Sequence, residues 1–190
     1  RNGFYGNCVL ERRSLYVRSG SEYRTLEDSL DAAIAHTAFF RFYARHIELD
    51  RSFKPGHYVL EPGMNIVQVA RMLKLGLQTP VRVTINNVRT PAQLAGKLAR
   101  QIEADSATIV GALTDPATAR KAGFDSVTLF SMFIPDTYEF YWTVSPAQFI
   151  ERMRRESDRF WTPQRDAKRQ RSGLSRLEVM TLASIVYEET

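Results

Sequence analysis

Two adjacent carboxylates close the sequence, and they have the clearest potential for chemistry. The final stretch reads LASIVYEET, residues 182–190, with Glu188 and Glu189 directly before Thr190. Burial raises the pKa of a glutamate because it disfavours the charged carboxylate. Such a glutamate can donate a proton near neutral pH, as general acid catalysis requires. The alternative interpretation is a pair of solvated carboxylates at the end of a helix.

Helical spacing separates the two glutamates. One row of the expected helix is apolar and is made of Leu182, Ile185 and Val186. Glu189 continues this row at spacings of three and four residues, whereas Glu188 continues the more polar row of Thr181 and Ser184. Because the segment is apolar on nearly every side, it predicts a core helix that begins after Ser175. The pattern therefore favours Glu189 as the desolvated acid.

A second candidate segment reads FIPDTYEFY, residues 133–141. Pro135 forces an extended backbone on the residue before it, and Asp136 with Thr137 can set a turn. A dense aromatic patch follows, made of Tyr138, Phe140, Tyr141 and Trp142. The segment predicts either a buried turn with aromatic packing or a cleft wall. In a cleft wall, the aromatic faces would stack on sugar rings and Asp136 would orient a hydroxyl.

The elements that position these segments are marked by cap residues and β-branched runs. Helices are expected at about 25–37, 65–75, 90–104 and 145–161, within 105–122 with a break at Asp115-Pro116, and from 175 onward. Strands are expected at 14–17, 57–60 and 81–85. The pattern predicts the α+β class: a β-α-α-β-α-β unit over 12–85, preceded by a segment 1–11 and followed by a mostly helical part over 86–190.

Part of the first unit is similar to a known sugar-binding module. Residues 54–70, KPGHYVLEPGMNIVQVA, resemble the LysM pattern of a strand, a Pro-Gly turn and an N-capped helix. LysM modules bind N-acetyl-sugar polymers, so the resemblance implies contact with such a polymer. The alternative is an ordinary strand-turn-helix structure, in which the same types of residue occur without sugar binding.

Composition excludes several other classes of protein. The 190 residues include one cysteine and three histidines without ligand spacing, so no metal site is expected, and no motif calls for a cofactor. No run of about 20 apolar residues is present. The net charge of +5 is concentrated in residues 151–171, where four acids are interleaved. Such a run is typical of a solvated helix face, and without a recognised motif it does not indicate a nucleic-acid partner.

Together, FIPDTYEFYW and LASIVYEET resemble the paired motifs of the endolytic murein transglycosylases, the MltG or YceG-like family. The resemblance covers about residues 12–190 and includes a LysM-like unit upstream. In the family the catalytic glutamate directly precedes the threonine of the last motif, and here that residue is Glu189. This sequence departs from the family at Tyr187, where many members have glutamate, at Glu188, where many have lysine, and at VTINNVRT, residues 83–90.

The resemblance implies a lytic transglycosylase that cleaves nascent peptidoglycan strands without water. Asp136, Tyr138, Ser184 and Glu188 are then candidates for substrate contacts. The implied setting is the periplasmic side of the inner membrane, with an N-terminal anchor before residue 1 and peptidoglycan synthases (penicillin-binding proteins) as partners. The catalytic domain is expected to continue past Thr190, so residues 1–190 alone are expected to be inactive. A non-catalytic peptidoglycan-binding or scaffold protein is the alternative function.

Overall fold

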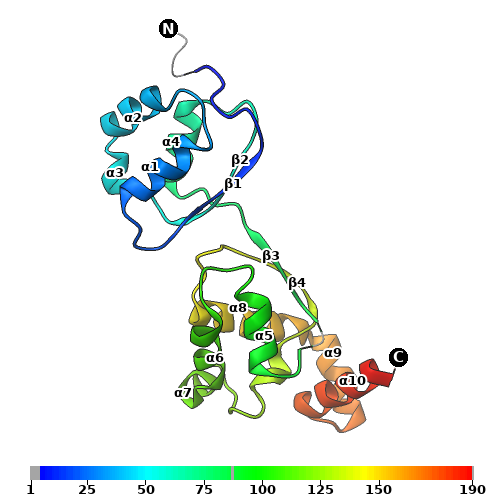
Figure 1. Ribbon diagram of the computed structural model, residues 1–190. Helices are drawn as coiled ribbons and strands as arrows, with labels where there is room; N and C mark the ends of the chain where they lie inside the picture. The colour runs from blue at the N-terminus through cyan, green and yellow to red at the C-terminus, as the bar shows by residue number, and fades with distance from the viewer. Residues whose placement is uncertain (1–4, 87, 190) are drawn as a thin grey trace. The chain divides into compact units, whose positions relative to one another are not determined.

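The computed structural model describes residues 5–86 and 88–189, with the side chains of residues 187–189 excepted. Helices alternate with two small two-stranded sheets, which confirms the predicted α+β class (Figure 1). The chain forms two compact units. The first comprises Arg1–Val81 and Glu139–Thr143, and the second comprises Arg82–Tyr138 and Val144–Thr190.

The first unit is built on an antiparallel pair of strands with helices packed against one face (Figure 1). Its elements are β1 (Arg13–Val17), α1 (Tyr23–Asp31), α2 (Thr37–His46), α3 (Leu49–Ser52), β2 (Gly56–Leu60) and α4 (Ile66–Leu75). Arg13 lies opposite Leu60, and Val17 lies opposite Gly56. Alternate side chains of β1 point inward, so Leu15 and Val17 are buried in the core of this unit.

Helix α4 begins and ends where its sequence predicts. The Asn65 side chain accepts a hydrogen bond from the Gln68 amide, and the Gln68 side chain accepts one from the Asn65 amide. This reciprocal pair satisfies two amide donors at the start of the helix. Gly76 closes the helix with φ of 67°, a left-handed conformation that costs glycine little.

The start of the chain and helix α1 differ from simple expectation. Cys8 and Val9 fall within the segment 1–11, yet both are buried in the core of the first unit and bond to the Met64 carbonyl. The helix expected over 25–37 is shorter: α1 ends at Asp31, and α2 begins at Thr37 after His36 adopts φ of 63°. Thr25 therefore lies inside α1 and does not cap it. Its spacing to Asp28 imitates a capping box.

The third predicted strand, β3 (Val81–Ile85), pairs with a strand that the sequence did not reveal. Its partner is β4 (Asp136–Phe140), in the stretch that predicted either a buried turn or a cleft wall. Side chains alternate along β4, with Tyr138 and Phe140 buried and Glu139 exposed. The structure has the expected β-α-α-β-α-β order with the short helix α3 added, but β3 pairs with a strand more than 50 residues later and not with the β1–β2 sheet.

The second unit has a helical core. Its helices are α5 (Pro91–Leu98), α6 (Ser106–Thr114), α7 (Pro116–Lys121), the 3-10 helix η1 (Leu129–Met132), α8 (Pro146–Phe160), α9 (Pro163–Ser172) and α10 (Arg176–Glu189). The predicted break at Asp115-Pro116 is confirmed, and the Asp115 carboxylate caps α7. The core is formed by large apolar side chains from α5, α6, η1 and α8, among them Leu94, Leu98, Ile109, Leu113, Met132, Phe149 and Met153.

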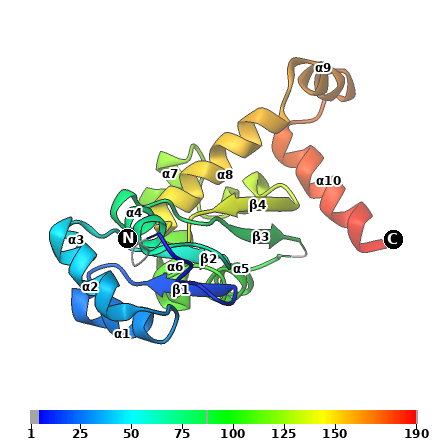
Figure 2. The same cartoon turned by 90° about the horizontal axis from the view of Figure 1, so that it is seen from above.

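Helix α10 is not the core helix that its composition predicts. Leu182 is 49% exposed, Ile185 is 53% exposed and Val186 is 62% exposed. Figure 2 shows α10 extending from the end of α9 as an arm beside β3 and β4. An apolar sequence creates a tendency to be buried, but burial needs neighbours, and the core elements of this unit pack together without α10. None of the helices in the described part of the chain is long and apolar enough to cross a membrane.

Candidate active site

A cavity of about 560 Å³ lies within the second unit, against one face of α10. Three segments supply its walls: the end of β3 with the loop after it, the stretch from Val127 to Pro135, and α10. The α10 residues in the wall are Leu177, Met180, Thr181, Ala183 and Ser184. This volume falls in the range typical of small-ligand sites, so it can hold a ligand of about the size of a disaccharide.

Hydroxyl groups in the wall point to the kind of ligand that fits. Ser131 Oγ donates to the Thr128 carbonyl at 2.7 Å, and Ser184 Oγ donates to the Thr181 carbonyl at 2.7 Å. Thr181 Oγ1 donates in the same way to the Leu177 carbonyl at 2.9 Å. Since each hydroxyl gives its hydrogen to the backbone, it presents oxygen lone pairs to a ligand. Sugar hydroxyls and amide N–H groups are suitable donors for these acceptors.

The loop after β3 contributes the remaining polar groups. Asn86 lines the cavity, and its side-chain oxygen accepts a hydrogen bond from Lys97 Nζ at 2.7 Å. Arg89 is the single charged residue among the described residues in the wall. Its backbone amide donates to Gln93 Oε1 at 2.9 Å, which anchors the loop to the first turn of α5. The cavity is otherwise apolar, so it suits a ligand with methyl groups beside its polar groups.

The structure brings some of the predicted site residues together and separates others. Ser184 lines the cavity, and so does Pro135 of the second motif. Asp136 is exposed outside the lining, where its carboxylate accepts a hydrogen bond from the Thr137 amide at 2.7 Å. The backbone of α10 reaches Glu188 and Glu189, but the side chains of both lie outside the described part of the chain.

Tyr138 is a structural residue in the described geometry. Its ring is buried, and its hydroxyl donates to the Ile134 carbonyl at 2.7 Å. Burial, with smaller contributions from Asp136 and Glu156, raises the pKa of Tyr138 to about 12. The hydroxyl therefore stays protonated and braces the turn before β4, where Pro135 enters the cavity wall.

Tyr138→Phe is expected to lower the free energy of unfolding by about 1 kcal/mol, because the Ile134 carbonyl loses its buried partner. Ligand binding in the cavity should change little, since the ring remains in place. Chemical denaturation of both proteins measures the first effect, and binding of a soluble glycan measures the second. A large loss of glycan affinity with unchanged stability would instead make Tyr138 a substrate contact.

The same residue predicts a dependence of stability on alkaline pH. The pKa of an unfolded tyrosine is about 10, and a raised native pKa contributes stability that is present below that value. The contribution of Tyr138 should therefore disappear as pH rises from about 10 to about 12, and Tyr138→Phe should be less sensitive over that window. Tyr23 and Tyr58 share this behaviour, because burial raises the pKa of each to about 12.

The exposure of Leu182, Ile185 and Val186 on α10 removes one argument for preferring Glu189 to Glu188 as the acid. The row that leads to Glu189 was expected to be buried and to desolvate it. Over the described residues that row is exposed, as Thr181 and Ser184 are too, and the cavity lies against the side that carries Thr181 and Ser184. Desolvation by the described residues therefore gives no preference for Glu189. Among the described residues, no group of histidine, cysteine and acidic side chains could hold a metal ion.

Comparison with known proteins identifies the family. A sequence model of the YceG-like family matches residues 15–190, which is most of the chain. The chain belongs to the YceG-like family. No curated protein matches it. The residues that match the YceG-like model include both motifs, FIPDTYEFYW and LASIVYEET.

A solved structure supports the YceG-like fold. The crystal structure of a YceG-like protein from Listeria monocytogenes matches with a TM-score of 0.54 at 21% sequence identity. The match covers 95% of the present chain and 65% of the Listeria chain, so the present chain spans less than two thirds of that protein. At this identity the similarity concerns the fold.

Sequence reasoning missed the part of the cavity wall made by Asn86, Arg89 and Ser131. One signal was available. The loop VTINNVRT departs from the usual family pattern, and it supplies both Asn86 and Arg89 to the wall. Ser131 had no local signal, because its place in the wall depends on the approach of η1 to α10.

Proposed function

We propose that this YceG-like protein is an endolytic lytic transglycosylase of peptidoglycan. The substrate is the β-1,4 bond between N-acetylmuramic acid and N-acetylglucosamine within a nascent glycan strand, and the product carries a 1,6-anhydro end. The observation that supports the proposal most is the cavity against α10, the helix that ends in the LASIVYEET motif. Its methyl-lined wall and hydroxyl acceptors suit the acetamido groups and hydroxyls of such a glycan.

One carboxyl group is sufficient for this reaction. Protonated Glu189 donates its proton to the glycosidic oxygen as the C1–O bond breaks and positive charge develops at the muramyl C1. The resulting carboxylate then takes the proton of the muramyl C6 hydroxyl, and O6 attacks C1 of the same sugar. Glu189 ends protonated, and no water is consumed. Intramolecular attack benefits from enforced proximity, whereas ordinary glycosidases need a second carboxylate.

The proposal extends to the cellular setting that the family resemblance implies. The activity would lie on the periplasmic side of the inner membrane, where nascent strands emerge, and a single N-terminal anchor would hold the protein there. Its partners would be glycan strands and the peptidoglycan synthases that make them, so cleavage would terminate strand growth. Fractionation and crosslinking of the full-length protein in cells would test both statements.

Product analysis in labelled water tests the reaction directly. The intact protein is incubated with purified peptidoglycan in water enriched in ¹⁸O, and the products are separated and weighed by mass spectrometry. A lytic transglycosylase gives anhydro ends without label. Labelled reducing ends would indicate a hydrolase. Binding without new ends would favour the alternative of a non-catalytic glycan-binding or scaffold protein.

A further inference from the structure

The turn between α9 and α10 is held by a polar network, which we call the elbow and define as Trp161 to Glu178. Helix α9 ends at Ser172, and the φ of 73° at the following Gly173 lets the chain reverse sharply. Helix α10 begins three residues later with its own capping box. The Glu178 carboxylate accepts from the Ser175 amide at 2.7 Å, and Ser175 Oγ accepts from the Glu178 amide at 3.2 Å.

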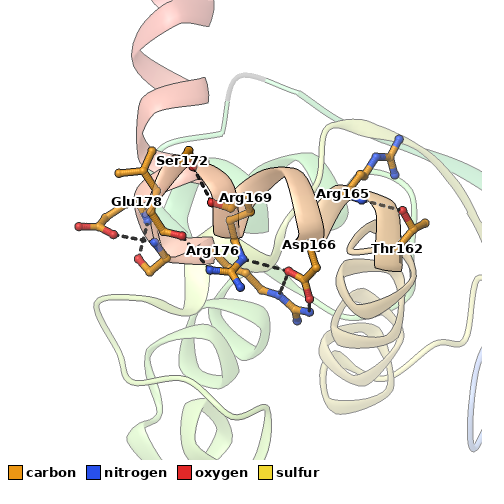
Figure 3. A network of polar contacts seen from close by, with 9 residues as sticks. Thr162, Arg165, Asp166, Arg169, Ser172, Arg176 and Glu178 are labelled. Carbon is orange, nitrogen blue, oxygen red and sulfur yellow. Dashed lines mark hydrogen bonds and ion pairs between the residues drawn. The ribbon is translucent and has the colours of Figure 1, made fainter.

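Asp166 is the centre of the elbow, and Figure 3 shows the two arginines that converge on it. Arg176 Nη2 donates to Asp166 Oδ2 at 2.5 Å, and Arg176 Nε donates to Asp166 Oδ1 at 3.2 Å. Arg169 Nε also donates to Asp166 Oδ1, at 3.0 Å. The hydrogen bonds from Arg176 and then Arg169 lower the pKa of Asp166 to about 2, so its charge persists at every physiological pH.

Two further contacts attach this ion cluster to the surrounding chain. The Arg176 guanidinium lies 5.3 Å from the centroid of the buried Trp161 ring, directly after α8. Arg169 Nη1 donates to the Leu174 carbonyl at 2.8 Å, inside the turn itself. A single arginine on α10 therefore contacts both the carboxylate of α9 and the aromatic residue after α8. A planar guanidinium with paired hydrogen bonds fixes direction as well as distance.

Helix α10 has little core packing beyond its contact with η1, which is why the elbow matters. Helix α9 has no buried residue, and the apolar row of α10 is about half exposed over its described residues. Exposed ion pairs contribute little to overall stability. We therefore expect the elbow network to act mainly on the orientation of α10, since it joins the first turn of α10 to α9 and to the buried Trp161.

A small change at the elbow is magnified along the helix. The 14 residues of α10 span roughly 20 Å at 1.5 Å per residue. A swing of about 10° at the first turn would displace the far end by roughly 3–4 Å over that length. A displacement of about 1 Å at a reacting group can already cost a hundredfold in rate.

We propose that Asp166 and Arg176 are positioning residues that fix the direction of α10 and thereby place its C-terminal end, with Glu188 and Glu189, beside the cavity. The predicted effect on turnover rests on the proposed function, whereas the predicted effect on the orientation of α10 does not. Neither residue is expected to touch substrate. Substitution of either residue should let α10 sample several orientations and so lower the turnover rate, while the second unit stays folded.

The test uses the intact protein and measures geometry and reaction separately. Spin labels are placed on cysteines introduced at Arg155 of α8 and Val186 of α10, both exposed, while the native Cys8 is buried. Asp166→Asn is compared with a control, Glu151→Gln. The control also removes a carboxylate that pairs with an arginine, but its partner is Arg154 and both residues lie on α8. Arg176→Lys serves as the conservative variant, because lysine keeps the charge and loses the paired geometry.

Asp166→Asn should broaden the label-to-label distance distribution and lower the rate of anhydro-end release about tenfold or more. Its melting temperature should stay within about 3 °C of the reference protein. Arg176→Lys should be intermediate in both measurements, and Glu151→Gln should match the reference.

Three outcomes would overturn the proposal. The first is an unchanged distance distribution in Asp166→Asn, whatever its rate. The second is a broadened distribution with an unchanged rate. The third is a reference protein that releases no anhydro ends, in which case the proposed function is wrong and the role in the reaction falls with it. The distance measurement distinguishes the third outcome from the first, because it does not depend on activity.

Discussion

Glu189→Gln is expected to abolish the release of 1,6-anhydro products while leaving the fold intact. The amide of glutamine has nearly the shape of the carboxyl but cannot donate and then recover a proton. General acid–base catalysis by one side chain contributes roughly 10²- to 10⁴-fold, and here one residue would serve both steps. The measurement is the initial rate of anhydro-end formation from purified peptidoglycan, with circular dichroism to verify folding.

Glu188→Gln is the matched control, because it makes the same chemical change one residue earlier. We expect it to retain most activity. If Glu188→Gln were inactive and Glu189→Gln active, the assignment would have to be reversed. The comparison is informative because the apolar row of Leu182, Ile185 and Val186 is exposed over the described residues and does not by itself desolvate Glu189. The choice of Glu189 therefore rests on its place in the family motif.

Ala183→Phe is expected to weaken glycan binding about tenfold or more, which corresponds to about 1.4 kcal/mol. Ala183 lies in the cavity wall on a solvent-exposed part of α10, so a phenyl ring there occupies ligand space without disturbing the core. Stability should change little, because exposed substitutions away from special backbone features usually have small effects. Titration with a soluble glycan fragment measures the affinity, and thermal unfolding measures the stability.

Leu182→Phe provides the control for this prediction. It places the same ring at the adjacent position, which is exposed and outside the cavity lining. Glycan affinity should then stay within about twofold of the reference, which is less than 0.5 kcal/mol. Equal losses of affinity in the two variants would indicate that the ligand does not enter the cavity from this face of α10.

Local elements of the fold were predictable because neighbouring residues encode them. The capping box of Asn65 and Gln68, the left-handed Gly76 and the break at Asp115-Pro116 each depend on contacts within four residues. The β1 and β2 strands were also visible in their β-branched and aromatic residues. Such signals require no knowledge of what the rest of the chain does.

Features that depend on distant residues were not predictable in the same way. The pairing of β3 with β4 joins segments more than 50 residues apart, and DTYEF carried competing signals for a turn. The exposure of α10 could not be read from its hydropathy, because hydropathy states a preference and not the presence of a neighbour. The cavity combines three such segments, and of the predicted site residues with described side chains only Ser184 lies in its wall.

The discontinuity of the first unit in sequence has a practical consequence for dissecting this protein. Its return segment, Glu139–Thr143, supplies Trp142, whose ring meets Tyr16 at 5.1 Å, and Thr143, which bonds to Gln78. An expression fragment that ends at residue 85 would lack these two residues, so Tyr16 of β1 and Gln78, which lies between α4 and β3, would lose their partners. A single polypeptide that tests the sugar-binding resemblance of this unit therefore needs residues 139–143 grafted back through a short artificial loop.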